Sequence, residues 1–289
     1  MIIIKLVGGL GNQMFQYALG RHLALLNNTK LYLDITHYET DTLRKYELSC
    51  FDIQAKIADK QMLDDFTQYP HHLSRWQRLC QYYILGRRNL MITEPHFQYA
   101  EGIAGNYKEN IYLAGYWQSE KYFKAVETLI RKDVMLVKPL TFKAQEFERI
   151  IKSKNSVSLH IRRGDYIANA TVLEVHGVCS LNYYQQSIEL IKQRIEKPTF
   201  FVFSDDITWC KANLQIDSEV VFIENLQYNY EDLRLMSSCQ HHIIANSSFS
   251  WWGAWLNPNP DKIVIAPKEW FATTERNYQD VIPETWIKI

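Results

Sequence analysis

Short apolar runs alternate with segments of helical periodicity along most of the chain. Residues 2–7 are apolar and rich in β-branched side chains, as expected of a buried parallel strand. After a glycine-rich turn, residues 12–26 carry Phe15 and Leu19 at helical spacing. The pattern therefore predicts a strand, a turn and a helix at the N-terminus, followed by a second strand at residues 31–35.

The second half of the chain shows the same alternation more regularly. Repeated strand–helix units predict an α/β fold whose parallel sheet is covered by helices on both faces. Ligands of such sheets bind at the carboxyl ends of the strands, so the residues that follow each strand are the candidates for function. The strand-like runs are residues 157–161, 199–203, 220–223, 242–245 and 263–266, and the helical patterns are residues 183–195, 207–214, 231–239 and 249–256.

The chain length of 289 residues predicts two domains. We place the boundary near residues 152–156, where the regular series starts, which gives domains of residues 1–153 and 154–289. Residues 60–88 are mainly helical in pattern and rich in aromatic residues and histidine, and their role stays open. The first domain also contains a strand-like run at residues 111–117 and helical patterns at residues 120–130 and 142–152.

The charge balance argues against some classes of partner. Thirty-two basic and thirty-two acidic residues leave no net charge, so the long-range attraction on which nucleic-acid binding depends is missing. No apolar stretch reaches eighteen residues, and the short apolar start lacks the layout of a signal peptide, so no transmembrane segment is expected. We expect a cytoplasmic protein and leave open a peripheral contact with the inner face of the membrane.

The sequence does not indicate a metal site. Its five cysteines are widely spaced and include no C-x-x-C pair, which favours reduced, packed thiols. There is no D-x-D or H-E-x-x-H motif, and the adjacent histidines at 71–72 and 241–242 are interpreted as packing or surface residues. We therefore predict that no metal is required.

The heptapeptide HIRRGDY, residues 160–166, directly follows a predicted strand. Arg163-Gly164-Asp165 is the tripeptide that adhesion proteins present to integrins, whereas Arg162 and Arg163 suit the binding of phosphate. An adhesion tripeptide needs an exposed loop tip, but this segment leaves the rim of a sheet, so we favour phosphate. A solvated arginine pair that only closes the strand is the second interpretation.

Two more strand ends and one glycine turn add to the candidate chemistry. Ser204-Asp205-Asp206 follows one strand, and Asn246-Ser247-Ser248 stands where a helix begins, so it either caps the helix or binds an anion. The turn GGLGNQ, residues 8–13, lacks the third glycine of G-x-G-x-x-G and the lysine of a P-loop, which disfavours a nicotinamide enzyme or a kinase. Arginine, backbone amides and hydroxyls together indicate the handling of a diphosphate leaving group.

Five segments carry a resemblance to a known family. They are GGLGNQMFQYA (8–18), HIRRGDY (160–166), SDD (204–206), YEDLRLMSSCQHHIIANSSFSWWGAWLN (230–257) and IAPKEWF (265–271). In this order they resemble the bacterial α-1,2-fucosyltransferases of glycosyltransferase family 11. The resemblance implies a GT-B-type fold of two Rossmann-like domains with parallel sheets, in which the N-terminal domain binds the acceptor and the C-terminal domain binds GDP-fucose.

The implied reaction is the transfer of L-fucose from GDP-β-L-fucose to the 2-hydroxyl of a terminal β-galactoside. The resemblance implies inversion at the sugar, no metal, and a product in a surface polysaccharide, such as an O-antigen, or in an oligosaccharide. A transferase for another nucleotide sugar is one alternative. A nonenzymatic carbohydrate- or integrin-binding protein is the other.

The resemblance also assigns roles to residues. Arg162 contacts the donor diphosphate, Asp232 contacts the N–H edge of guanine, His160 lies near the nucleotide, and Asn12 lies close to the reacting centre. Asp206 either holds the donor or only caps the helix at residues 207–214. The predicted donor-binding set is Gly9, Gly11, His160, Arg162, Arg163, Asp206, Asp232, Asn246, Ser247, Ser248 and Phe249.

An inverting displacement also needs a base for the proton of the acceptor hydroxyl. Asp165, Glu174 and His176 are candidates, and Asp165 joins Arg162 and Asn12 as the predicted catalytic residues. The alternative for Asp165 is that it holds the arginines or caps a turn.

Several tryptophans suit stacking on a sugar ring, and their settings differ. Trp117 is predicted to contact the acceptor. The tryptophans at 251, 252 and 255 lie on one predicted helix, so we expect them to pack against the sheet.

Overall fold

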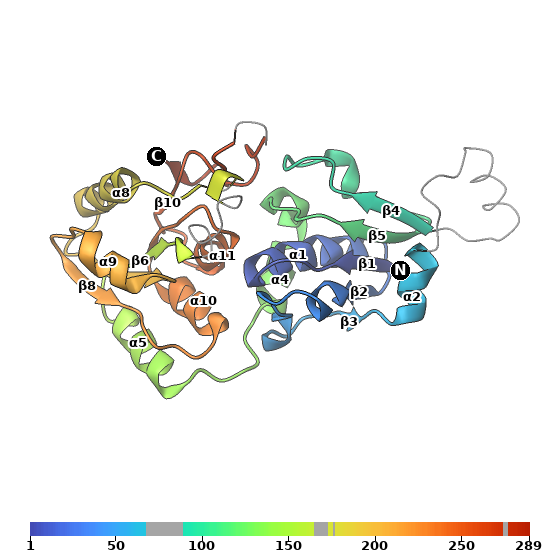
Figure 1. Ribbon diagram of the computed structural model, residues 1–289, viewed down its shortest axis with the longest axis horizontal. Helices are drawn as coiled ribbons and strands as arrows, with labels where there is room; N and C mark the ends of the chain where they lie inside the picture. The colour runs from blue at the N-terminus through green and yellow to red at the C-terminus, as the bar shows by residue number, and fades with distance from the viewer. Residues whose placement is uncertain (68–88, 165–172, 176, 274–276) are drawn as a thin grey trace, which may run out of the picture. The chain divides into compact units, whose positions relative to one another are not determined.

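The computed structural model describes residues 1–67, 89–164, 173–175, 177–273 and 277–289 (Figure 1). The chain forms two compact units, Met1–Val137 and Lys138–Ile289. Each unit contains one parallel sheet. Among the described residues, no helix combines the length and the apolar character needed to span a bilayer.

The sheet of the first unit has the strand order β3-β2-β1-β5-β4, and all of its strands are parallel. The chain runs outward from β1 through β2 to β3 and then continues on the other side of β1. The winding therefore reverses between β1 and β5, which is where ligands of doubly wound sheets bind. The strands are β1 (Ile2–Lys5), β2 (Leu31–Asp34), β3 (Lys56–Ile57), β4 (Asn89–Thr93) and β5 (Asn110–Ala114).

Helix α1 (Leu10–Leu26) follows β1 after the glycine turn, as the sequence predicts. A Cβ on Gly20 would lie 2.8 Å from Leu31 Cδ1 and 3.2 Å from Ile4 Cγ2, so this glycine lets the helix pack closely on β1 and β2. The other helices in the described part of this unit are α2 (Lys60–Thr67) and α4 (Glu127–Asp133), with 3-10 turns at Thr36–Glu39, Leu48–Cys50, Glu101–Ile103, Glu120–Tyr122 and Lys124–Val126.

The sheet of the second unit has the strand order β11-β10-β9-β6-β7-β8 and is also parallel throughout. Read from β8, the order is third, second, first, fourth, fifth and sixth, which is the Rossmann order with its reversal between β6 and β9. The predicted α/β class with parallel sheets is confirmed. The strands are β6 (Ser156–Ile161), β7 (Thr199–Ser204), β8 (Glu219–Phe222), β9 (His241–Ile243), β10 (Val264–Ala266) and β11 (Ile287–Lys288).

Helices cover both faces of this second sheet (Figure 1). Phe200 and Val202 of β7 pack in the core shared with α8 (Leu181–Arg194) and α9 (Ile207–Asn213). Phe201 and Phe203 point to the opposite face and pack against α5 (Phe142–Lys152) and α10 (Asn229–Ser238). The alternation follows from the two-residue period of a strand, and burial on both faces explains the continuous apolar run.

Helix α11 (Ser248–Leu256) carries three of the tryptophans. Trp251 and Trp252 are fully buried and Trp255 is 4% exposed, so their predicted core role is confirmed. A Cβ on Gly253 would lie 2.8 Å from Met236 Cβ, which shows how closely α11 and α10 approach each other.

The structure divides the chain earlier than residues 153 and 154, where the sequence analysis places the boundary. Helix α5 belongs to the second unit because Ile151 lies in its core, and because Glu148 accepts a hydrogen bond of 2.8 Å from Arg234 Nε on α10. The helix precedes the first strand of the unit that it covers. In a series of strand–helix units, each helix is grouped with the strand before it, so the sequence pattern assigns α5 to the preceding domain.

Candidate active site

Three polar segments meet at the carboxyl edge of the second sheet. Arg162 follows β6, Asp205 follows β7, and Asn246 leads from β9 into α11. Because β7, β6 and β9 are neighbours in that order, these ends lie side by side around the reversal point of the sheet. The sequence predicted this gathering from the strand positions.

Arg162 is held by Asp205. The Nη1 atom of Arg162 lies 3.0 Å from Oδ2 of Asp205, and the two side chains are 22% and 24% exposed. The other oxygen of Asp205 accepts a hydrogen bond of 2.9 Å from the backbone N–H of Arg163. A Cβ on Gly164 would lie 2.9 Å from Asp205 Oδ2, so the turn passes directly over this carboxylate. The sequence placed Asp205 in the polar segment after β7, but only Asp206 of that segment was predicted to bind the donor.

Asp206 has a different role in the structure. Its Oδ1 atom accepts the N–H of Trp209 at 3.1 Å and caps the N-terminus of α9, which is the alternative that the sequence left open. The guanidinium of Arg163 lies 3.6 Å from the centre of the Trp209 ring, and its Nε atom is 3.7 Å from Asp206 Oδ2. The two arginines of the motif therefore have different partners. Arg162 pairs with Asp205, whereas Arg163 packs on Trp209 within the unit.

His160 near the end of β6 is a neutral side chain. It is 5% exposed, and burial, followed by the charge of Arg162, lowers its pKa to about 3. Its ring centre lies 6.1 Å from that of Phe249 on α11. Within the described part of the chain, Nδ1 of this histidine has no hydrogen-bond partner. A neutral imidazole here can exchange hydrogen bonds with an uncharged group of a ligand but does not supply positive charge for phosphate.

The start of α11 combines a cap with half-buried polar groups. Ser247 Oγ accepts the N–H of Phe249 at 3.3 Å, so this hydroxyl caps the helix. Ser247, Ser248 and Phe249 are all partly exposed. Asn246 is 5% exposed and donates from Nδ2 to the carbonyl oxygen of Trp270 at 3.3 Å. Asn246 therefore anchors the edge, whereas residues 247–249 present a helix N-terminus, which favours anions.

Asp232 in the first turn of α10 is a perturbed carboxyl group. Burial, followed by the charge of Glu231, raises its pKa from 3.8 to about 7. Glu231 is fully buried and accepts the backbone N–H groups of Thr141 at 2.7 Å and Gln227 at 3.1 Å, so its role is structural. Asp232 is only partly buried and is the member of the pair that a ligand can reach.

The first unit carries its own polar edge at the reversal between β1 and β5. Gly8 has a φ of +76°, and a Cβ there would lie 2.5 Å from Nδ2 of Asn12, so only glycine fits. Asn12 Oδ1 accepts a hydrogen bond of 2.9 Å from Nε2 of Gln118, which follows β5. Of the other predicted glycines, Gly9 stands at the N-cap of α1 and Gly11 is buried in its first turn.

The turn after β5 corrects one prediction. Trp117 has a φ of +57° and is completely buried, so the prediction that it contacts an acceptor sugar is wrong. Glu94, which follows β4, accepts the backbone N–H groups of Tyr116 at 2.7 Å and Trp117 at 2.9 Å and holds the turn. Burial raises the pKa of Glu94. Tyr116 is 38% exposed and stacks on Phe97, so it is an accessible aromatic residue at this edge.

The candidate bases are only partly covered by the structure. Asp165 and His176 lie outside the described residues. Glu174 is described and exposed.

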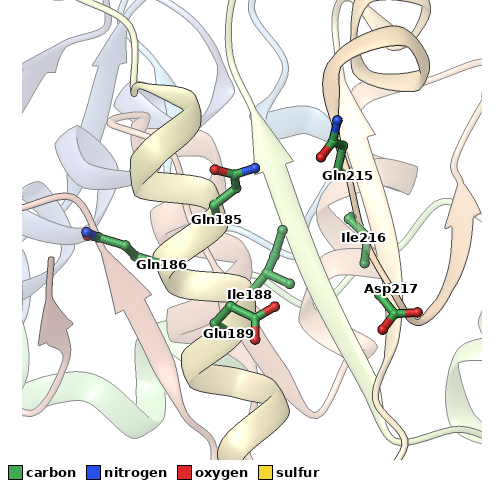
Figure 2. A pocket seen from close by; sticks show the side chains of 7 residues that line it. All are labelled: Gln185, Gln186, Ile188, Glu189, Gln215, Ile216 and Asp217. Carbon is green, nitrogen blue, oxygen red and sulfur yellow. The ribbon is translucent and has the colours of Figure 1, made fainter.

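A separate cavity of about 660 Å³ lies between α8 and residues 215–217 (Figure 2). Gln185, Ile188 and Glu189 line it from the helix, and Ile216 and Asp217 line it from the segment before β8. Residues 215–217 precede their strand, so this part of the cavity lies at the amino end of β8, opposite the edge that carries the arginine pair. Its described lining consists of glutamines, isoleucines and two carboxylates, and Lys192 is already paired with those carboxylates, at 3.1 Å from Glu189 and 4.0 Å from Asp217, so the cavity does not suit a diphosphate.

Two parallel, doubly wound sheets, the second with arginine and a helix N-terminus at its reversal point, match the architecture of GT-B-type glycosyltransferases. The fold is similar to that of the fucosyltransferase NodZ from Bradyrhizobium, with a TM-score of 0.53 and 14% identity over 87% of this chain and 91% of that chain. The chain belongs to glycosyl transferase family 11, whose family model matches residues 1–289.

Relatives of known activity cover nearly the whole chain. An alpha-1,2-colitosyltransferase of Escherichia coli is 38% identical over 100% of this chain and 99% of its own length. The O-antigen biosynthesis glycosyltransferase WbnK of Escherichia coli is 31% identical over 98% of this chain and 99% of its own length. Galactoside alpha-(1,2)-fucosyltransferase 2 of Hylobates lar is 25% identical over 92% of this chain and 71% of its own length.

Proposed function

We propose that the protein transfers L-fucose from GDP-β-L-fucose to the 2-hydroxyl of a terminal β-galactoside, with inversion and without a metal. The observation that carries this proposal is the position of Arg162, at the reversal point of a Rossmann-ordered sheet beside the start of α11. The α-1,2 linkage named for two of the relatives supports the choice of the 2-hydroxyl. The relation to WbnK supports an O-antigen or similar surface glycan as the acceptor.

The proposed chemistry rests on charge at the leaving group. Breaking the sugar–phosphate bond places negative charge on the β-phosphate, and donors fixed toward that oxygen stabilise the transition state more than the ground state. Arg162 supplies a permanent positive charge, and residues 247–249 supply a helix N-terminus. Loss of one charged donor of this kind costs about 3 kcal/mol, or roughly a hundredfold in rate.

Guanine recognition is assigned to Asp232. An ionised carboxylate accepts two hydrogen bonds in one plane, which matches the paired N–H groups of guanine. The partial burial of Asp232 strengthens such contacts, because the local dielectric constant is low. We propose neutral His160 as a nearby hydrogen-bonding group and Asp165 as the base for the acceptor proton.

A second donor is supported by the 38% identity to an alpha-1,2-colitosyltransferase. Colitose is fucose without its 3-hydroxyl group. A site that hydrogen-bonds this hydroxyl rejects colitose strongly, whereas an apolar contact at C3 discriminates by only about tenfold to a hundredfold. The ratio of kcat/KM for the two GDP-sugars therefore decides between them.

The deciding experiment is an assay with GDP-fucose and lactose in EDTA, in parallel with GDP-colitose, with assignment of the product linkage by NMR. The proposal expects an α-1,2-fucosylated product without added metal. A higher kcat/KM for GDP-colitose supports the second donor. Release of GDP without a glycosylated product, or activity only after metal is restored, contradicts the proposal. A nonenzymatic binding protein turns over neither donor.

A further inference from the structure

We propose that Asp205 is a positioning residue that fixes the guanidinium of Arg162 for the diphosphate of the donor. This inference rests on the proposed function and adds a residue to its machinery. Asp205 acts on the reaction only through Arg162 and the turn at residues 162–164.

The first argument is geometric. Ile161 and Ser204 are paired partners at the ends of β6 and β7, so Arg162 and Asp205 are the next residues beyond the pair. One carboxylate oxygen contacts the side chain of Arg162 at 3.0 Å, and the other accepts the N–H of Arg163 at 2.9 Å. Asp205 thus ties the side chain and the backbone of the turn to one rigid strand end.

The second argument is the fit above the carboxylate. A Cβ at position 164 would lie 2.9 Å from Asp205 Oδ2 and 3.1 Å from its Cγ. Gly164 therefore allows the turn to lie against Asp205, where any other residue at position 164 would crowd the carboxylate. A guanidinium is planar and rigid, so one anchored nitrogen restricts the orientation of the whole group.

If only its charge mattered, Asp205 would hinder the binding of the donor instead of helping the reaction. Its negative charge beside Arg162 weakens the attraction of the site for a diphosphate. Removal of that charge strengthens nucleotide binding if the charge is all that matters. If orientation matters, the same change slows turnover, because an unfixed donor must reorganise during the reaction.

The neighbouring Asp206 offers a matched control. It carries the same charge one residue away, but it caps α9 through the N–H of Trp209. Asparagine also caps helices well, so Asp206→Asn removes the charge and keeps the cap. The comparison of Asp205→Asn with Asp206→Asn therefore separates position from charge.

The test is a double-mutant cycle with Arg162→Lys. Four variants, Asp205→Asn and Asp206→Asn with and without Arg162→Lys, are compared with the wild-type protein and Arg162→Lys alone for kcat, KM for GDP-fucose, Kd for GDP and Tm. We expect Asp205→Asn to lower kcat roughly tenfold to a hundredfold while Kd for GDP changes less than about threefold. In the Arg162→Lys background, the same change is expected to lower kcat by no more than about twofold, whereas the effect of Asp206→Asn multiplies independently.

Two results overturn the inference. One is a kcat for Asp205→Asn within about twofold of the wild type, and the other is full multiplication of its effect with that of Arg162→Lys. If Asp205→Asn does not fold, Asp205→Glu decides. This change keeps the charge but moves the carboxylate one methylene further from the backbone, so positioning predicts a loss of kcat and charge alone predicts wild-type turnover. An inactive wild-type protein refutes the proposed function instead, which keeps the two failures distinct.

Discussion

The pH dependence of nucleotide binding tests the role of Asp232 most directly. Burial and the charge of Glu231 raise the pKa of Asp232 to about 7 in the free protein. Only the ionised carboxylate accepts both N–H groups of guanine at once, because the protonated group turns an O–H donor toward one of them, so the protonated protein binds poorly. About 90% of molecules carry the ionised form at pH 8 and about 10% at pH 6. The Kd for GDP is therefore expected to rise about tenfold from pH 8 to pH 6, because the apparent Kd is the intrinsic value divided by the competent fraction.

Isothermal titration calorimetry measures this effect in two ways. The titration at several pH values gives Kd, and titrations at pH 7 in buffers of different ionisation enthalpy give the protons released. Binding to the ionised form releases about half a proton per GDP at pH 7, since about half of the free protein is protonated there. His160 does not contribute, because its pKa of about 3 lies below the range.

Asp232→Asn provides the control. This variant should bind GDP more weakly than the wild type at pH 8. Between pH 6 and 8, its Kd should change only as much as the ionisation of the GDP phosphates requires. A wild-type Kd that is constant over this range, or an equal pH dependence in both proteins, refutes the reasoning.

The same shift affects the stability of the free protein. The folded-state pKa of Asp232 lies above its unfolded value of 3.8, so the folded state binds the proton more tightly. This contribution to stability is fully present below pH 4 and is lost as the pH rises toward about 7. Denaturant unfolding of the wild type and of Asp232→Asn should therefore show that the variant loses less stability between these pH values.

Five substitutions separate catalysis from packing. Arg162→Lys should keep its Tm within a few degrees and lose at least about a hundredfold in kcat/KM, because lysine cannot present a planar fork. Arg163→Lys should mainly lower Tm, because the guanidinium of Arg163 stacks on the indole ring of Trp209. Gly8→Ala should lower the free energy of unfolding by about 1–2 kcal/mol, since φ is +76° and the new Cβ would lie 2.5 Å from a side-chain amide. Gly9→Ala, whose Cβ would have no neighbour closer than 3.9 Å, is the matched control in the same urea titration. Trp117→Phe should lower the free energy of unfolding by about 1–3 kcal/mol and leave KM for lactose within about threefold; a large rise in KM without loss of stability contradicts its core role.

The sheet of the second unit was predictable because its strands are buried on both faces. Such strands are continuous apolar runs, and β6 and β7 lie within one residue of the bounds that the sequence predicts. The predicted strands give the carboxyl edge of the sheet. They also give the positions on that edge of the arginine pair and of the polar residues before α11. Most of the site could therefore be located without coordinates.

Edge strands were not predictable in the same way. β3 is only two residues long and exposed, and β4 is a short apolar run whose Leu90 and Met91 are exposed, so neither is a buried strand like β6 or β7. Their conformation depends on pairing with β2 and β5, which are distant in sequence. Propensity and periodicity describe local preferences and do not contain such pairings.

The choice between Asp205 and Asp206 also needed the structure. The two residues are identical and adjacent, and the chain turns between the end of β7 and the start of α9. A sequence pattern shows that one of them suits a helix cap, but it does not show which one the turn directs toward β6. Trp117 is similar, because its φ of +57° places the ring in the core, and no residue pattern indicated that backbone conformation.

The Arg-Gly-Asp tripeptide can now be judged from its surroundings. An adhesive tripeptide must present its arginine to a partner, but the side chain of Arg163 is only 20% exposed and its guanidinium lies on Trp209. Gly164 lies against Asp205, which also binds the backbone of Arg163. To expose the arginine, the protein must break the stacking and the contact with Asp205 together. Arg163 and Gly164, the two members of the tripeptide that the structure describes, are therefore part of the framework around Arg162, which favours a transferase over an adhesion protein.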